Sequence, residues 1–157
     1  DQQDLIKHVG KPGIAAVNGC ARGGGSGLAI SCDLALAGES ARFGYPEVKH
    51  GIVAAIVMAG LVEHVGRKAA FELVATGRTV AADEAVQLGL VNRVVADDKL
   101  LDEARTLAQA LAAHPVNAMR ATKAIFHQVA ELPFSEGLKL GQQLNARMRA
   151  FRQEQPA

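Results

Sequence analysis

The sequence contains no tryptophan, one tyrosine and two cysteines among its 157 residues. Neither Cys20 nor Cys32 lies in a CxxC pair or beside a histidine at metal-ligand spacing, which argues against a disulfide framework and a zinc site. No apolar run approaches the roughly 20 residues that a membrane helix requires. Lysine and arginine number 17 against 16 acidic residues, so charge gives no reason to expect nucleic acid or an anionic membrane as partner. These absences predict a protein of a reducing compartment without a bound metal.

The hydrophobic content of 49% is that of a globular protein, and 157 residues are enough for one domain with its own core. The polar start leads through residues 5–9 directly toward a first strand, without the turn chemistry that usually opens a domain. We therefore expect the sequence to be a fragment of a longer protein.

Short strands alternate with helices in the first half of the predicted structure. Apolar runs between turn signals predict strands at residues 14–17, 34–37, 41–43 and 91–95. Helical periodicity followed by a glycine predicts helices at 53–65, 67–76 and 83–88. A longer helix is expected to be capped by Asp97-Asp98 and to end near residue 114. Two more are expected, one from Pro115 to about 132 and a last one capped by Ser135. The fold class is therefore α/β, with an essentially helical second half.

A glycine loop, Arg22-Gly23-Gly24-Gly25-Ser26-Gly27, runs from the first strand toward a helix that we expect to start at Leu28. Unobstructed N–H groups at a helix N-terminus suit an anion or an oxyanion. A P-loop is excluded because no Gly-Lys-Ser/Thr follows, and Leu28 breaks both the dinucleotide pattern and a nucleophile elbow. Two interpretations remain at this stage: an oxyanion site, or a tight turn that permits close helix packing.

Residues 11–19 (KPGIAAVNG) and 21–25 (ARGGG) closely match a KPxIAAVxGxAxGGG pattern. This stretch resembles the enoyl-CoA hydratase/isomerase (crotonase) family, and the similarity continues through residues 32–33, 43–47 (FGYPE), 66–70, 76–77 and 85–91. The resemblance implies a ClpP/crotonase-like spiral of β-β-α turns followed by a helical C-terminal region. It divides the chain into residues 1–78, part of the spiral core with the site, and 79–157, a mainly helical oligomerisation region. It also implies an N-terminal stretch and a last helix that we expect this chain to lack.

The resemblance assigns one oxyanion N–H to Gly24, and it assigns the other N–H and most coenzyme A contacts to the N-terminal stretch outside this sequence. It gives Glu47 the acid/base role, and Gly27 stands where the family's hydratases carry another glutamate. Substrate contacts are expected at positions shared with the family's pattern, namely Gly23, Gly24, Gly25, Gly27, Tyr45 and Val48. One carboxylate suffices to move a double bond, so the sequence favours 3-enoyl to 2-enoyl-CoA isomerisation. The alternatives are a hydratase with a replaced second base and a non-catalytic acyl-CoA-binding subunit.

The resemblance further implies an acyl-CoA substrate, with coenzyme A entering as part of it and no separate cofactor. It implies a homotrimer or a dimer of trimers, in the cytoplasm of a bacterium or in the mitochondrial matrix. Several chemically capable side chains match no catalytic position of the family, and we expect them to be structural or solvated: His50, His64, Ser26, Cys20, Lys123, Lys139, Arg147 and Arg149. Without that context, Glu47 alone is typical of a solvated turn residue after Pro46.

Overall fold

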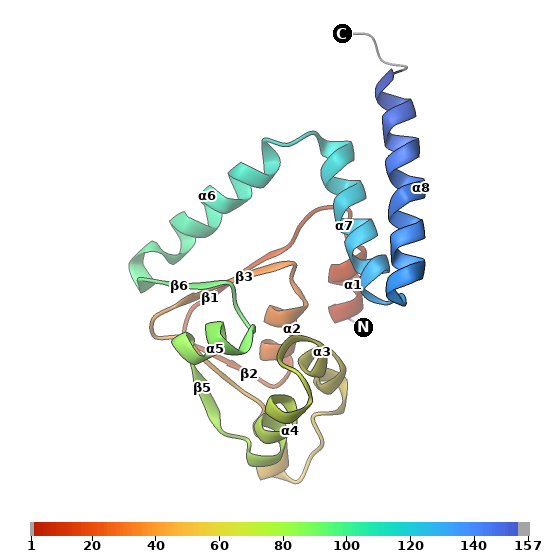
Figure 1. Cartoon of the computed structure of the whole chain (residues 1–157). Coiled ribbons are helices and arrows are strands. Elements are labelled where there is room, and N and C mark those ends of the chain that lie inside the picture. Colours follow the sequence, from red (N-terminus) through yellow and green to blue (C-terminus); the bar gives the residue numbers. More distant parts are fainter. Residues whose placement is uncertain (1, 154–157) are drawn as a thin grey trace. The chain divides into compact units, whose positions relative to one another are not determined.

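The computed structural model describes residues 2–153 and divides into two compact units, Asp1–His114 and Pro115–Ala157. The first unit contains short strands and helices in alternation (Figure 1). Its elements are α1 (Gln2–His8), β1 (Ile14–Val17), β2 (Cys20–Arg22), α2 (Gly24–Ser31), β3 (Leu34–Gly38), β4 (Arg42–Gly44), the 3-10 helix η1 (Pro46–His50), α3 (Ala55–Val65), α4 (Arg67–Thr76), β5 (Thr79–Ala81), α5 (Ala82–Leu88), β6 (Arg93–Val95), the 3-10 helix η2 (Asp97–Lys99) and α6 (Leu100–Ala112).

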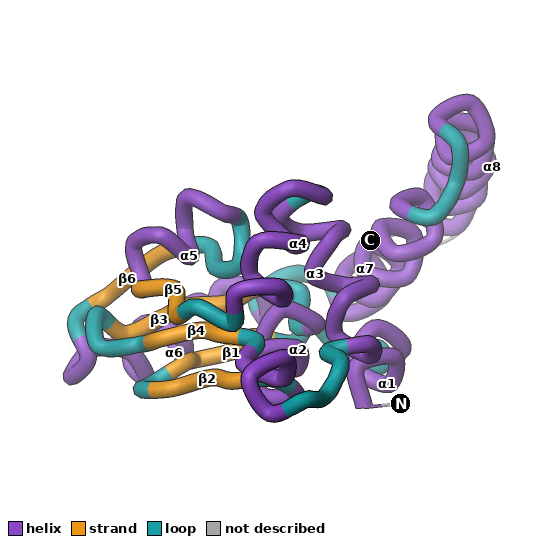
Figure 2. Tube along the Cα trace, turned by 90° about the horizontal axis from the view of Figure 1, so that it is seen from below, coloured by secondary structure: helices purple, strands orange, loops and turns teal. Residues whose placement is uncertain are grey.

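The strands form two three-stranded sheets, in the orders β1-β3-β6 and β2-β4-β5. Equivalent strands of successive turns pair in parallel, with Ile14 opposite Leu34 and Arg22 opposite Gly44, whereas β5 is antiparallel to β4. In each of the first two turns the chain places one strand in each sheet and then adds helices, whereas in the third turn β5 enters its sheet before α5 and β6 enters the other sheet after it. Figure 2 shows the strands stacked beside one another, with α2, α3 and α4 along one side. This repeated β-β-α turn confirms the predicted spiral.

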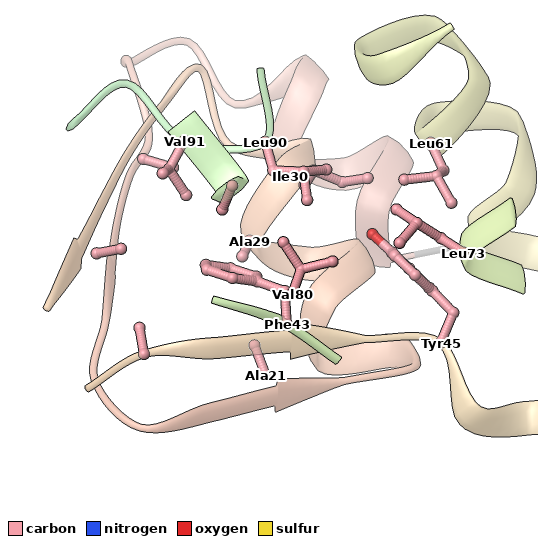
Figure 3. Close-up of a cluster of buried hydrophobic side chains, with 14 of the residues drawn as sticks. Ala21, Ala29, Ile30, Phe43, Tyr45, Leu61, Leu73, Val80, Leu90 and Val91 are labelled. Carbon is pink, nitrogen blue, oxygen red and sulfur yellow. The ribbon is translucent and has the colours of Figure 1, made fainter. Parts of the chain in front are cut away.

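The core of the first unit lies between the β2-β4-β5 sheet and helices α2 to α5 (Figure 3). Phe43 and Tyr45 alternate with Gly44 at the end of β4, so both aromatic rings point to the same side of the sheet. Both are fully buried, as are Leu61 of α3 and Leu73 of α4. Burial of such large apolar side chains stabilises the first unit strongly. Truncating one of them to alanine typically lowers the free energy of unfolding by about 2–5 kcal/mol.

The second unit consists of α7 (Val116–Ala130) and α8 (Phe134–Gln153), which pack against each other. A Cβ added at Gly137 would lie 3.1 Å from Val129 Cγ1, so glycine lets the two helices approach closely. Several of the unit's large apolar side chains are exposed, among them Phe126 and Phe134. In the part of the chain that the structure describes, no helix has the length and apolar character that crossing a membrane requires.

Most of the predicted elements are confirmed, but helix starts differ. Helix α2 begins at Gly24 rather than Leu28, because the glycines themselves adopt helical geometry. Ser135 is not a cap, since α8 already begins at Phe134. The acidic pair forms η2, and Asp97 Oδ1 accepts from the Ser40 N–H at 3.1 Å instead of capping the long helix. Residues 5–8, expected to lead straight into a strand, belong to α1.

The compact units do not follow the expected division at residue 78. Strand β6 pairs with β3, and α6 packs against β1 and β3, so residues 79–114 belong with the first unit. Asn92 reinforces this attachment, because its side-chain oxygen accepts from the Ala35 N–H at 2.7 Å. The expected oligomerisation role of the helical region stays a prediction.

Candidate active site

The glycine loop begins where β2 leaves its sheet. Gly23 has φ +51°, a left-handed conformation that a residue with a Cβ adopts only at a cost. Its N–H donates to the Gly44 carbonyl oxygen at 2.9 Å, which continues the β2–β4 pairing by one residue. The loop and the segment after β4 therefore leave the sheet side by side.

Glu47 lies against this loop. A Cβ built at Gly23 would be 2.8 Å from Glu47 Oε1 and 3.5 Å from Cδ, so only glycine leaves room for the carboxylate in this position. Glu47 is half-buried on η1, and its other oxygen, Oε2, is buried without a hydrogen-bond partner among the described residues. The structure therefore brings together the two features that the sequence analysis singled out, the glycine loop and the acid/base candidate.

The next residues supply hydrogen-bond donors beside the carboxylate. Gly24 and Gly25 are exposed, and a Cβ at either would meet no atom within 4 Å. They form the first turn of α2, where N–H groups have no partner within the helix and favour negative charge. The Gly27 N–H instead donates to the Gly23 oxygen at 2.9 Å, and Gly27 is buried. The site thus combines outward N–H groups with one carboxylate, and position 27 adds no second one.

Tyr45 does not lie on the surface of the site, where a substrate contact was expected. Its side chain is fully buried, and its hydroxyl and that of Ser26 are both without a hydrogen-bond partner in the described part of the chain. Burial raises the pKa of the Tyr45 phenol, the nearby Ser26 hydroxyl partly offsets that rise, and the Glu47 charge adds a smaller rise. The two hydroxyls are therefore close together, although their geometry falls short of a full hydrogen bond. An unpaired buried group of this kind costs about 1–3 kcal/mol.

Apolar side chains follow Glu47 along the surface. Val48 is 48% exposed, and Ile52 and Val53 are 61% and 70% exposed, while Met58 is partly covered. The sequence predicts substrate contact at Val48, and the exposure of its side chain leaves it accessible for one.

Gly77, directly after α4, lies against η1. Gly77 has φ +60°, and a Cβ there would lie 3.0 Å from Lys49 Cε and 3.3 Å from Pro46 Cα. Arg78 donates to Glu72 at 2.7 Å and to both oxygens of Glu84, which ties α4 to α5. Sequence reasoning identified Gly77 only as a helix stop, because nothing local indicates that η1 packs on it.

Among the described residues, no side-chain hydrogen bond or ion pair joins His50, His64 or Cys20 to Glu47. The His64 ring shares a hydrogen bond with the Gly60 oxygen of its own helix, at 2.7 Å, and His50 is exposed at the end of η1. Cys20 is an exposed free thiol on β2, and Lys123 is buried within the second unit's α7. Among the residues that the structure describes, no group of three or more His, Cys, Asp or Glu could hold a metal ion.

Comparison with known proteins gives a consistent result. The family model of enoyl-CoA hydratase/isomerase matches residues 1–155. A Thermus thermophilus relative is 47% identical over 139 residues, covering 88% of this chain and 55% of the relative. The 2,3-dehydroadipyl-CoA hydratase of Escherichia coli is 42% identical over 140 residues, covering 88% and 55%. The chain thus spans little more than half the length of these relatives.

Solved structures agree in fold. An enoyl-CoA hydratase/isomerase family protein from Silicibacter pomeroyi superposes with a TM-score of 0.90 at 31% identity, covering 99% of this chain and 64% of that one. A Thermobifida fusca protein solved in complex with CoA gives 0.89 at 34% identity, covering 96% and 59%. The chain belongs to the enoyl-CoA hydratase/isomerase family, a family of enzymes with the crotonase fold.

Proposed function

We propose that the whole protein acts on an acyl-CoA thioester through a stabilised enolate, and that it moves a double bond from the 3-enoyl to the 2-enoyl position. One observation carries this proposal: the Glu47 carboxylate packs against Gly23, directly before the exposed N–H groups of Gly24 and Gly25. A base beside donors for a developing oxyanion is the arrangement that proton transfer next to a thioester carbonyl requires.

The reaction needs one carboxylate. Glu47 removes a proton from the α carbon of the 3-enoyl thioester, and the electron pair moves into the carbonyl, whose oxygen accepts from the Gly24 N–H. The protonated Glu47 then returns the proton at the γ carbon, and the double bond closes between the α and β carbons. Substrate and product have the same mass. The resemblance places the second oxyanion donor outside this chain, and losing one such donor typically costs about a hundredfold to a thousandfold in rate.

Support for the acyl-CoA substrate comes from relatives. The Thermobifida fusca relative was solved with CoA, and the E. coli relative is named for an enoyl-CoA substrate. The exposed aliphatic side chains of Val48, Ile52 and Val53 supply a surface suited to an acyl chain beside Glu47. The cellular compartment and trimeric assembly stay predictions.

Hydration of a 2-enoyl-CoA is the second candidate, because relatives carry hydratase and dehydratase names. Hydration requires a group that activates water in addition to the group that exchanges the α proton. Position 27, where the family's hydratases place that group, is glycine here. A hydratase would therefore need a replacement base from the rest of the protein.

Incubation of the whole protein with a 3-enoyl-CoA and, separately, with a 2-enoyl-CoA tests both candidates. Double-bond migration without mass change, lost in Glu47→Gln, is the expected result. The matched control is Glu39→Gln, which neutralises an exposed carboxylate in the turn after β3. Addition of water as the main reaction would replace the isomerase proposal with the hydratase, and tight acyl-CoA binding without turnover would identify a non-catalytic subunit.

A further inference from the structure

Three polar atoms lie buried directly behind the candidate site. Ser26 Oγ, Tyr45 Oη and Glu47 Oε2 are each inaccessible to solvent and without a hydrogen-bond partner among the described residues. The Ser26 and Tyr45 side chains are both 0% exposed. Native proteins pair the large majority of buried polar groups, so three unpaired atoms beside the glycine loop call for a common explanation.

The backbone brings together the two chain segments that carry these three residues. The hydrogen bond from the Gly23 N–H to the Gly44 oxygen, at 2.9 Å, joins the two chain segments that carry them. Tyr45 directly follows Gly44, and Ser26 lies one helical turn beyond Gly23 in α2. The Glu47 carboxylate packs on Gly23 itself. Figure 3 shows the Tyr45 ring reaching from the end of β4 into the buried cluster, with its oxygen pointing inward.

The donors and acceptors of the three groups match. Ser26 and Tyr45 each offer one O–H, and an ionised carboxylate only accepts. We propose that the Tyr45 O–H donates to Glu47 Oε2 and the Ser26 O–H donates to the Tyr45 oxygen, so that Tyr45 is a positioning residue for Glu47. The inference rests on the proposed function, because Glu47 is the acid/base group of that reaction.

Such a chain would hold the inner carboxylate oxygen and leave Oε1 facing the glycine loop, where the α carbon of a bound thioester would lie. Charged acceptors form the stronger kind of hydrogen bond, and linked bonds polarise one another. The raised pKa of the Tyr45 phenol keeps it protonated and hence a donor. Neither hydroxyl is a replacement second base, because both are buried away from any substrate.

Removal of the phenolic hydroxyl tests positioning in the whole protein. Tyr45→Phe should lower kcat for double-bond migration by about tenfold, the typical consequence of losing one hydrogen bond to a charged group, while KM changes little. Phe43→Leu is the packing control, because it disturbs the same buried strand end without a hydroxyl. Phe43→Leu should lower the unfolding temperature, and its loss of kcat should be smaller than that of Tyr45→Phe. A Tyr45→Phe enzyme with wild-type kcat would overturn the proposal.

A second pair of variants guards against a folding defect at Tyr45. Ser26→Ala should lower kcat by a smaller factor, because it removes only the outer bond of the chain. Ser31→Ala removes a hydroxyl from the same helix, where Oγ donates to the Gly27 oxygen at 2.7 Å. It should leave kcat unchanged, and equal losses in the two variants would contradict the special role of Ser26.

A measurement without turnover separates this inference from the proposed function. In protein labelled with carbon-13 at the tyrosine ζ position, the Tyr45 resonance is the one that disappears in Tyr45→Phe. Glu47→Gln should shift that resonance at neutral pH, and Glu39→Gln should not, because the ζ carbon responds to the hydrogen bond of the phenol. A resonance unmoved by Glu47→Gln refutes the contact even in an active isomerase. A shifted resonance in a protein without isomerase activity upholds the contact while the proposed function fails.

Discussion

Substitution of Gly23 by alanine should separate the geometry of the site from the stability of the fold. The added Cβ would lie 2.8 Å from Glu47 Oε1, about 0.6 Å closer than the 3.4 Å at which ordinary contact begins. The carboxylate must therefore move away from the glycine loop. Misplacing a catalytic group by about 1 Å can cost about a hundredfold in rate, so we expect kcat for isomerisation to fall by about tenfold to a hundredfold.

Backbone strain adds a second effect that needs its own control. At φ +51° a non-glycine residue costs about 1–3 kcal/mol, which should lower the unfolding temperature by a few degrees. Gly19→Ala imposes similar strain at φ +75°, with no atom within 4 Å of the added Cβ. Steady-state kinetics and thermal unfolding of both variants are the assay. Wild-type kcat in Gly23→Ala, or an equal loss of kcat in Gly19→Ala, would refute the reasoning.

Two further substitutions test contacts just after α4: the packing of η1 on Gly77 and the ion pair between Arg78 and Glu84. Gly77→Ala should destabilise the protein more than Gly66→Ala in thermal unfolding, because its Cβ would meet Lys49 Cε at 3.0 Å whereas that at Gly66 meets nothing within 4 Å. Arg78 lowers the pKa of the Glu84 carboxyl, so the stability from this pair is present above the ordinary value of 4.5 and is lost as pH falls below it. Glu84→Gln should therefore lower the free energy of unfolding in urea by about 1 kcal/mol at pH 7 and by less at pH 3. The loss is small because the ion pair is exposed to solvent. An equal cost at both pH values would contradict the assignment.

The sequence predicts strands and helices well where turn residues bound them. Residues 14–17 lie between two turn-forming pairs, and the predicted strand matches β1. Glycines likewise marked the ends of α3, α4 and α5. Strands β2 and β5 were missed because each buries a single residue between two exposed ones, so neither shows an apolar run and each depends on its long-range partner.

The candidate site was predictable in composition but not in arrangement. The family resemblance supplied Gly24 and Glu47, whereas nothing in the local sequence places the Glu47 carboxylate against Gly23. That contact depends on the register of β2 with β4, which is a tertiary property. Tyr45 was expected at the substrate because it lies in the FGYPE stretch that resembles the family, but directly after β4 its ring points into the core, as that of Phe43 does.

The contact network suggests how one frame can serve more than one reaction. The Gly23 N–H is engaged by the Gly44 oxygen, so in the proposed reaction the oxyanion donor is one of the following residues, and the same hydrogen bond holds the segment that leads to Glu47. The donors and the base are therefore held by one contact and move together. Gly27 takes part in this frame only through its backbone, whose N–H donates to the Gly23 oxygen at 2.9 Å. The side chain at position 27 can therefore change the number of acid/base groups without altering the bonds that align donors and base, which is how closely similar chains could divide between isomerisation and hydration.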